Sequence, residues 1–154
     1  MNQCVLVLDN IRSVANVGSI FRTADCLGVS KIILVGTTPA PLDRFGRKRK
    51  DFVKVSLGAE EFVKWEYITK VTPLLVKMKK EKFKIIALEQ AKGSMDLKDF
   101  KAPKRFVLIV GNEIDGLPRR LLGKCDKIVE IPMRGKKESM NVSVSAGIAL
   151  FNLL

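Results

Sequence analysis

Three loops in the sequence place polar side chains directly after short apolar runs. They are residues 111–116 (GNEIDG) after Val110, residues 132–135 (PMRG) after Ile131, and residues 89–90 (EQ) after Leu88. Glycine permits positive φ and close backbone approach, so Gly111, Gly116 and Gly135 suit a ligand held mainly by main-chain groups. Neither a GxxxxGK[ST] nor a GxGxxG pattern occurs, so the usual cradles for nucleoside triphosphates and dinucleotides are missing.

Two further segments carry polar residues at expected helix starts. An apolar stripe at helical spacing runs through residues 17–27. Arg22 lies outside this stripe and is therefore predicted to be exposed. Taken singly, Asn16 is expected to be an N-cap and Arg22 a solvated charge. Asn141, with Ser139 just before it, is a natural N-cap for the last helix.

The overall composition limits the chemistry. The chain contains no histidine, which excludes an imidazole base, a histidine metal ligand and a Ser-His triad. Its 28 Lys and Arg against 16 Asp and Glu give a net charge of +12, which favours a polyanionic partner such as RNA or DNA. The three cysteines, Cys4, Cys26 and Cys125, are widely spaced and are expected to be reduced and mostly buried.

Short continuous apolar runs alternate with helical patterns along the chain. The runs at residues 5–8, 31–35, 84–88, 106–110 and 127–131, with a weaker one at 63–68, are typical of strands buried on both faces. Helices are expected at 17–27, 72–82 and 118–124. This alternation predicts an α/β fold with a parallel sheet covered by helices, whose ligand sites lie beyond the carboxyl ends of the strands.

Two more segments suggest partners. Residues 37–50 are expected to form an exposed loop, and five of its residues form a basic cluster that we predict binds RNA: Arg44, Arg47, Lys48, Arg49 and Lys50. The final helix, residues 141–154, is apolar almost all round and must be buried on most sides. A homodimer interface explains it more simply than a core helix inside one chain.

Taken together, three segments resemble the motifs of the TrmH (SpoU) branch of the SPOUT RNA methyltransferases. They are NVGSIFRTA from Asn16, IVGNEIDGL from Ile109, and IPMRGKKESMNVSVSAG from Ile131. The resemblance extends over essentially the whole chain in motif order and spacing. It implies a parallel-sheet SPOUT fold with helices on both faces and a C-terminal deep trefoil knot, working as a homodimer.

The resemblance also implies residue roles. The cofactor S-adenosylmethionine would bind against Leu88, Gly111, Ile131, Met133 and Met140, where Met140 replaces the leucine usual in the family. The catalytic set would be Arg22, Asn16, Glu113, Ser139 and Asn141, with Arg22 serving the pocket of the other subunit.

The implied reaction is transfer of a methyl group to a ribose 2′-hydroxyl of tRNA or rRNA, with no metal. Positioning supplies much of the catalysis because the donor is already activated. A guanidinium is a poor base, so we expect Arg22 to orient the ribose or phosphate and to stabilise the developing alkoxide. The proton acceptor stays unassigned.

The length of 154 residues predicts one SpoU-type catalytic domain over residues 1–154 without an appended RNA-binding domain. No apolar run is long enough to cross a membrane and no secretory signal is visible, so a cytoplasmic location is expected. Two alternatives remain: an inactive RNA-binding homologue of the same fold, and a basic α/β enzyme acting on a phosphorylated small molecule.

Overall fold

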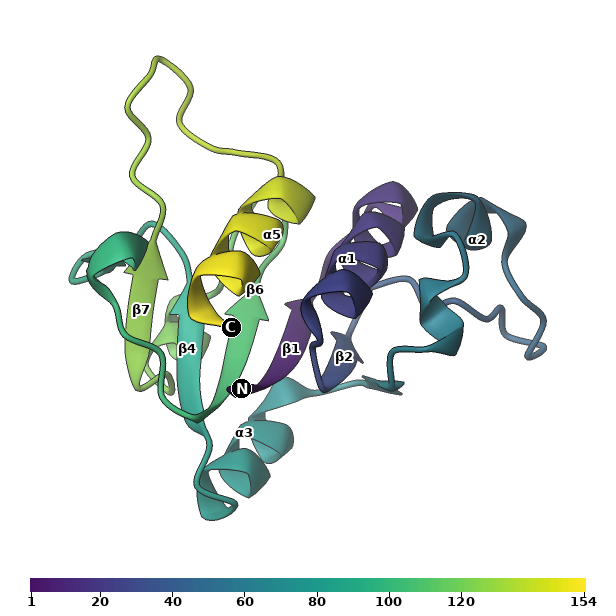
Figure 1. The fold of residues 1–154 in the computed structure, drawn as a ribbon, viewed down its shortest axis with the longest axis horizontal. Helices are drawn as coiled ribbons and strands as arrows, with labels where there is room; N and C mark the ends of the chain where they lie inside the picture. Colours follow the sequence, from purple (N-terminus) through teal and green to yellow (C-terminus); the bar gives the residue numbers. More distant parts are fainter.

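The apolar runs of the sequence form one parallel sheet in the computed structural model, which describes all 154 residues. The strand order is β3-β2-β1-β6-β4-β7-β5, and every paired neighbour is parallel. Figure 1 shows the sheet with its covering helices. The strands are β1 (Gln3–Asp9), β2 (Lys31–Val35), β3 (Trp65–Ile68), β4 (Lys84–Leu88), β5 (Met95–Asp96), β6 (Arg105–Val110) and β7 (Lys127–Glu130).

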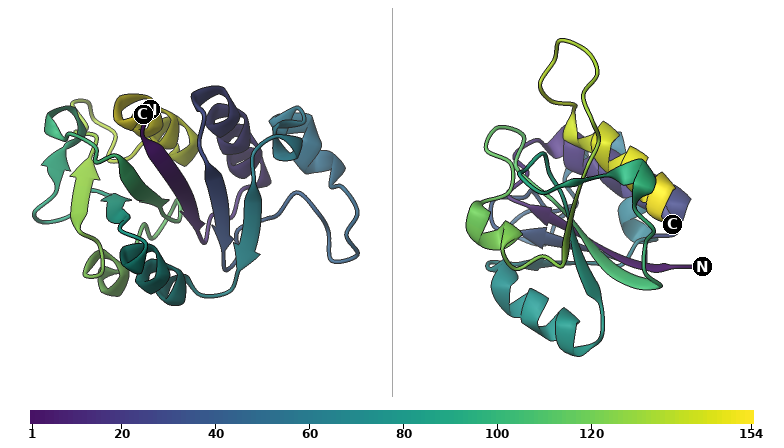
Figure 2. Two further views of the ribbon diagram at one scale, coloured as in Figure 1. Left: turned by 60° about the horizontal axis from the view of Figure 1, so that its bottom comes forward. Right: turned by 90° about the vertical axis from the view of Figure 1, so that its left-hand side faces the viewer.

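The central strands are apolar at successive positions because both faces of the sheet are covered. In β1, Leu6 and Leu8 belong to one core cluster, whereas Val5 and Val7 belong to the other. Such alternation follows from the two-residue side-chain period of a strand. Figure 2 shows α1 and α5 on one side of the sheet and α3 on the other, which confirms the predicted α/β fold with helices on both faces.

Most helices lie close to the predicted ranges. They are α1 (Val14–Leu27), α2 (Lys50–Ser56), α3 (Val71–Lys80), α4 (Arg119–Leu122) and α5 (Val142–Leu153), with short 3-10 turns η1 (Ala59–Glu61) and η2 (Leu97–Asp99). The prediction that Asn16 caps α1 is wrong. Ser13 is the N-cap and its hydroxyl accepts a hydrogen bond from the Asn16 N–H, so the helix begins a turn earlier.

The predicted loop at 37–50 ends in a helix that the sequence did not indicate. Lys50 is the first residue of α2, and Phe52 of α2 is fully buried. The ring of Phe52 packs edge-on against Phe21 of α1, with 5.2 Å between ring centroids. A seven-residue helix offers too few turns to show a clear period, so packing against α1 carries its stability.

The last helix is buried on one side only. Asn141 is its N-cap, as predicted, and Val142, Ala146, Ala149, Leu150 and Leu153 are buried. On the opposite side Val144, Ile148 and Phe151 are 50%, 41% and 79% exposed. The helix is therefore not a core helix within a single chain, and burial of its other side by a partner subunit stays a prediction.

The cysteines differ in environment. Cys4 is buried and Cys125 partly buried, but Cys26 is exposed, contrary to expectation. Burial raises the pKa of the Cys4 thiol to about 12 and that of Cys125 to about 11. Separately, none of the helices combines the length and hydrophobicity needed to cross a membrane.

Candidate functional site

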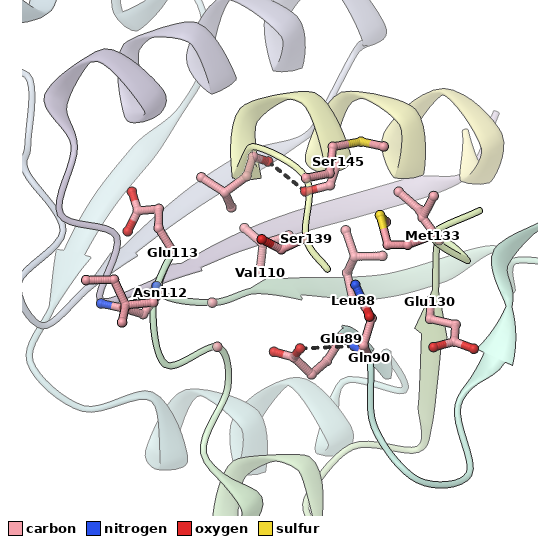
Figure 3. Close-up of a pocket in the computed structure, with 16 residues that line it drawn as sticks. Leu88, Glu89, Gln90, Val110, Asn112, Glu113, Glu130, Met133, Ser139 and Ser145 are labelled. Atoms are coloured by element: carbon pink, nitrogen blue, oxygen red, sulfur yellow. Dashed lines mark hydrogen bonds between the residues drawn. The ribbon is translucent and has the colours of Figure 1, made fainter. Parts of the chain in front are cut away.

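A pocket lies where the carboxyl ends of three neighbouring strands meet. Leu88 ends β4, Val110 ends β6 and Glu130 ends β7, and all three line the pocket. Leu88 pairs in register with Val110, which brings the loops that follow the two strands together. Parallel sheets of this kind place ligand sites beyond their carboxyl edge. Figure 3 shows these residues beneath α5, with Ser145 projecting from the helix.

The structure brings together most of the residues singled out in the sequence. All five predicted cofactor-binding residues line the pocket, and so do two of the predicted catalytic residues. These seven are Leu88, Gly111, Ile131, Met133, Met140, Glu113 and Ser139.

Asn16 and Asn141 do not line the pocket, but Asn16 is hydrogen-bonded to one of its residues and Asn141 is hydrogen-bonded to Asn16. Asn16 Nδ2 donates to Glu113 Oε1 at 3.1 Å, and Asn141 Nδ2 donates to Asn16 Oδ1 at 3.1 Å. This bridge joins the three sequence motifs through side chains that lie 97 and 125 residues apart in the chain.

Glu113 is the centre of this bridge. Its Oε1 also accepts from the Ser13 N–H at 3.3 Å, and its Oε2 accepts from the Arg12 N–H at 3.2 Å. Partial burial would raise the pKa of Glu113, but the hydrogen bonds from Asn16, Arg12 and Ser13 outweigh it, so the pKa lies below its ordinary value. Glu113 is therefore ionised at neutral pH and fixes the start of α1 beside the pocket.

A second carboxylate fixes the floor of the pocket. Glu89 Oε2 accepts from the Leu117 N–H at 2.8 Å, and its Oε1 accepts from the Gln90 N–H at 3.0 Å. Gln90 Nε2 in turn donates to the Glu138 carbonyl oxygen at 3.0 Å. The residues after β4 thus tie down both other loops of the pocket. Sequence reasoning marked residues 89–90 by their place after a strand but assigned them no role.

Two of the three marked glycines are required by this geometry. Gly116 has a φ of +65°, and a Cβ there would collide with the Glu89 carboxylate. A Cβ on Gly111 would lie 2.7 Å from Leu117 Cγ. Gly135 has neither a positive φ nor a crowded Cβ position, so the expectation of a special backbone requirement fails there.

The pocket lining is acidic although the whole chain is basic. Of its 16 residues, Glu89, Glu113 and Glu130 carry carboxylates and none is Lys or Arg. Apolar side chains form much of the remaining wall: Leu88, Val110, Ile114, Ile131, Met133, Met140 and Val142. Such a lining suits a cationic ligand with an apolar part and gives no cradle to a phosphate.

Arg22 and the basic cluster are not part of the pocket. Arg22 is exposed on α1 and lies about 9 Å further along the helix axis than Asn16, at about 1.5 Å per residue. The cluster of Arg44, Arg47, Lys48, Arg49 and Lys50 precedes and begins α2, which lies toward the opposite end of the longest axis from β4 and β7 (Figure 1).

Three cations of the basic cluster already have acidic partners. Arg47 pairs with Asp43, Lys48 with Glu61, and Arg49 with Asp51. Arg134, Lys136 and Lys137 are exposed on the loop between β7 and α5, and they form no salt bridge. The loop beside the pocket therefore presents three unpaired cations, whereas the cluster before α2 presents two, Arg44 and Lys50.

Comparison with known proteins gives a consistent result. The family model described as SpoU rRNA Methylase family matches residues 3–151. A 23S rRNA (guanosine-2′-O-)-methyltransferase RlmB from Neisseria meningitidis is 38% identical over 95% of this chain and 56% of its own length. The chain thus spans little more than half the length of that curated relative.

Solved structures agree in fold. An AdoMet-bound rRNA methyltransferase from Sinorhizobium meliloti has a TM-score of 0.85 at 30% identity, covering 97% of this chain and 55% of that one. The A. aeolicus TrmH/SpoU tRNA modifying enzyme has a TM-score of 0.84 at 27% identity, covering 99% and 74%. Because the family model matches almost the whole chain, the chain belongs to the SpoU rRNA methylase family.

Proposed function

We propose that this chain binds S-adenosylmethionine in the acidic pocket and transfers its methyl group to a ribose 2′-hydroxyl of RNA. The observation that carries the proposal is the pocket itself, with three carboxylates and an apolar wall at the carboxyl ends of β4, β6 and β7. S-adenosylmethionine supplies an activated methyl group and carries a sulfonium and an ammonium against one carboxylate. Its net positive charge matches the carboxylates, and the aromatic faces of its adenine match the apolar wall.

The same lining argues against a phosphorylated small molecule as substrate. A phosphate would need cationic donors or a ring of free N–H groups. The pocket lining has no Lys or Arg, and the N–H groups of Arg12, Ser13, Gln90 and Leu117 beside it already donate to Glu113 and Glu89. The positive charge of the chain lies outside the pocket and would bind a polyanionic substrate there.

Contacts in the structure support positioning roles for three of the five predicted catalytic residues. Glu113, Asn16 and Asn141 position α1, α5 and the loop after β6 relative to one another. Ser139 lines the pocket beside the cofactor residues. Arg22 does not line the pocket of its own chain. We assign it to the pocket of a second subunit, where its guanidinium would orient ribose or phosphate and stabilise the developing alkoxide.

The exposed face of α5 supports this homodimer. Val144, Ile148 and Phe151 form an apolar strip, and Ile148 and Phe151 also line a groove with Leu97 and Ile131. A second copy of the chain is the occupant that would bury the strip and bring its Arg22 to the shared site. The same proposal includes the C-terminal trefoil knot that is expected from the family.

RNA is the proposed partner, and both proposed RNA surfaces are basic loops. They are the cluster from Arg44 to Lys50 and the loop that carries Arg134, Lys136 and Lys137. The named relatives act on rRNA and on tRNA, so the proposal covers ribose in either class of RNA, with the enzyme in the cytoplasm where both are found.

The pocket assignment is tested by calorimetric titration of the purified chain with S-adenosylmethionine. We expect saturable binding that a Gly116→Val substitution abolishes, because the new side chain would displace the Glu89 carboxylate. Gly46→Val, another glycine with positive φ but at a distance from the pocket, is the matched control and should still bind. Absence of binding to the unaltered chain would leave an RNA-binding homologue without methyl transfer.

A further inference from the structure

Phe45 is an exposed aromatic ring with two arginine guanidiniums over it. It lies in the loop between β2 and α2, and its side chain is 66% exposed. The guanidinium carbons of Arg44 and Arg47 lie 4.7 Å and 5.0 Å from the centroid of its ring. A large apolar side chain in water with guanidiniums over its ring offers a π-system and positive charge at one spot, and a base that stacks there would take the place of a guanidinium.

The turn that carries Phe45 is ordered by a network around Asp43. The Asp43 Oδ1 accepts from the N–H groups of Phe45 at 2.8 Å and of Arg47 at 3.0 Å, and its Oδ2 accepts from Arg47 Nε at 2.9 Å. Leu42 and Lys48 close the turn with an antiparallel bridge. The ring is therefore presented by a preorganised turn, which lowers the entropy lost on binding.

We propose that Phe45 is a stacking platform for an unpaired base of the RNA substrate, with Arg44 and Arg47 contacting the adjacent phosphates. This inference rests on the proposed function, since it takes RNA as the partner. Every base has a π-face, and aromatic stacking with arginine at its side is the common way of holding single-stranded nucleic acid. In a duplex the neighbouring base pairs cover those faces, so the platform selects a loop or a single strand.

The position of the turn separates recognition from chemistry. Figure 1 shows the loop before α2 at one end of the longest axis and the loop between β7 and α5 beside the other end. The stacked base is therefore a nucleotide other than the one methylated in the pocket of the same subunit. Lys48 and Arg49 nearby are engaged with Glu61 and Asp51, so stacking contributes more here than charge.

The test measures affinity for two fluorescent probes, an oligoadenylate of about 16 nucleotides and a fully paired RNA duplex of equal length. Phe45→Ala should weaken binding of the single strand by about 5- to 100-fold. Phe45→Trp should bind the single strand as well as the unaltered chain does. Phe45→Leu keeps apolar bulk without a π-face and should bind as poorly as Phe45→Ala. The slope of log affinity against log salt should be unchanged, because no phosphate contact is lost.

The outcomes separate this inference from the proposed function. Full affinity of Phe45→Ala or Phe45→Leu for the single strand, or an equal loss on the duplex, overturns the platform while RNA binding itself stands. Failure of the unaltered chain to bind either probe overturns both. Thermal unfolding and S-adenosylmethionine titration of each variant, expected to match the unaltered chain, show that a loss of affinity is not a loss of fold.

Discussion

At the scale of single residues, Glu113 does more than its place in a loop suggests. Its carboxylate accepts hydrogen bonds from Asn16 and from the backbone of Arg12 and Ser13, so one side chain fixes the start of α1. Glu113→Gln replaces one acceptor oxygen by an amide donor that faces an N–H. We expect a loss of about 1 kcal/mol in unfolding free energy at neutral pH, below the usual range for charged hydrogen bonds because the site is solvated.

The loss should depend on pH in one direction. Because the pKa of Glu113 is lower in the folded state than its ordinary value, the stabilisation is present above the ordinary pKa of 4.5 and disappears as pH falls through the folded pKa. Denaturant unfolding at several pH values should show the variant and the parent converging in acid. Asp115→Asn, an equal charge change on an exposed neighbour, is the control and should show no such convergence.

The sequence predicted the residues that line the pocket better than those that contact them indirectly. Gly111 and Glu113 could be predicted because they follow a strand, and parallel strands end at one edge, whereas Ser139 was predicted only from the family resemblance. Asn16 was misassigned as a helix cap because Ser13, three residues earlier, is an equally good cap. The hydrogen bonds of Glu89 to Leu117 could not be predicted, since they depend on how two loops meet in space.

At the scale of elements, α5 has one apolar face packed in the core of its own chain and another that is exposed. Leu150 is fully buried in the core of its own chain, whereas Phe151 is 79% exposed. Leu150→Lys should unfold the chain, since a buried unpaired charge costs more than about 4 kcal/mol. Phe151→Lys should change the unfolding free energy of the subunit by no more than about 0.5 kcal/mol and shift the molecule from dimer to monomer.

Sedimentation of both variants at micromolar concentration distinguishes these effects. A folded Phe151→Lys protein that sediments as the parent does, or a parent that is itself monomeric, contradicts the interface proposed for α5. The aperiodic apolar pattern of this helix predicted burial on most sides, but it could not tell core contacts from contacts with another subunit.

The two basic loops should contribute unequally to RNA binding. Replacing Arg134, Lys136 and Lys137 by glutamine should lower the magnitude of the slope of log affinity against log salt by roughly 2, at about 0.7 per contact with a single strand. Replacing Arg47, Lys48 and Arg49 should lower it by less than about 1, since each already has an acidic partner. Fluorescence anisotropy with total tRNA over a salt series measures both, and a larger change in the second variant contradicts this ranking.

At the scale of the whole molecule, the fold class followed from the sequence but the strand order did not. Lys31–Val35 and Lys84–Leu88 were predicted to the residue because strands buried on both faces are continuous apolar runs between turn residues. Which run pairs with which is not encoded in such patterns. The two-residue strand β5 (Met95–Asp96) at the sheet edge is too short to show any pattern.

The most direct test of the account is transfer itself. The purified chain is incubated with S-adenosylmethionine labelled in its methyl group and with total tRNA and rRNA, and the RNA is digested to nucleosides. We expect label on ribose 2′-oxygens only, lost in Arg22→Ala and poor in Arg22→Lys, while both variants bind the donor within a few-fold of the parent. Label on a base, or full activity of Arg22→Ala, would contradict the proposed reaction and its shared site.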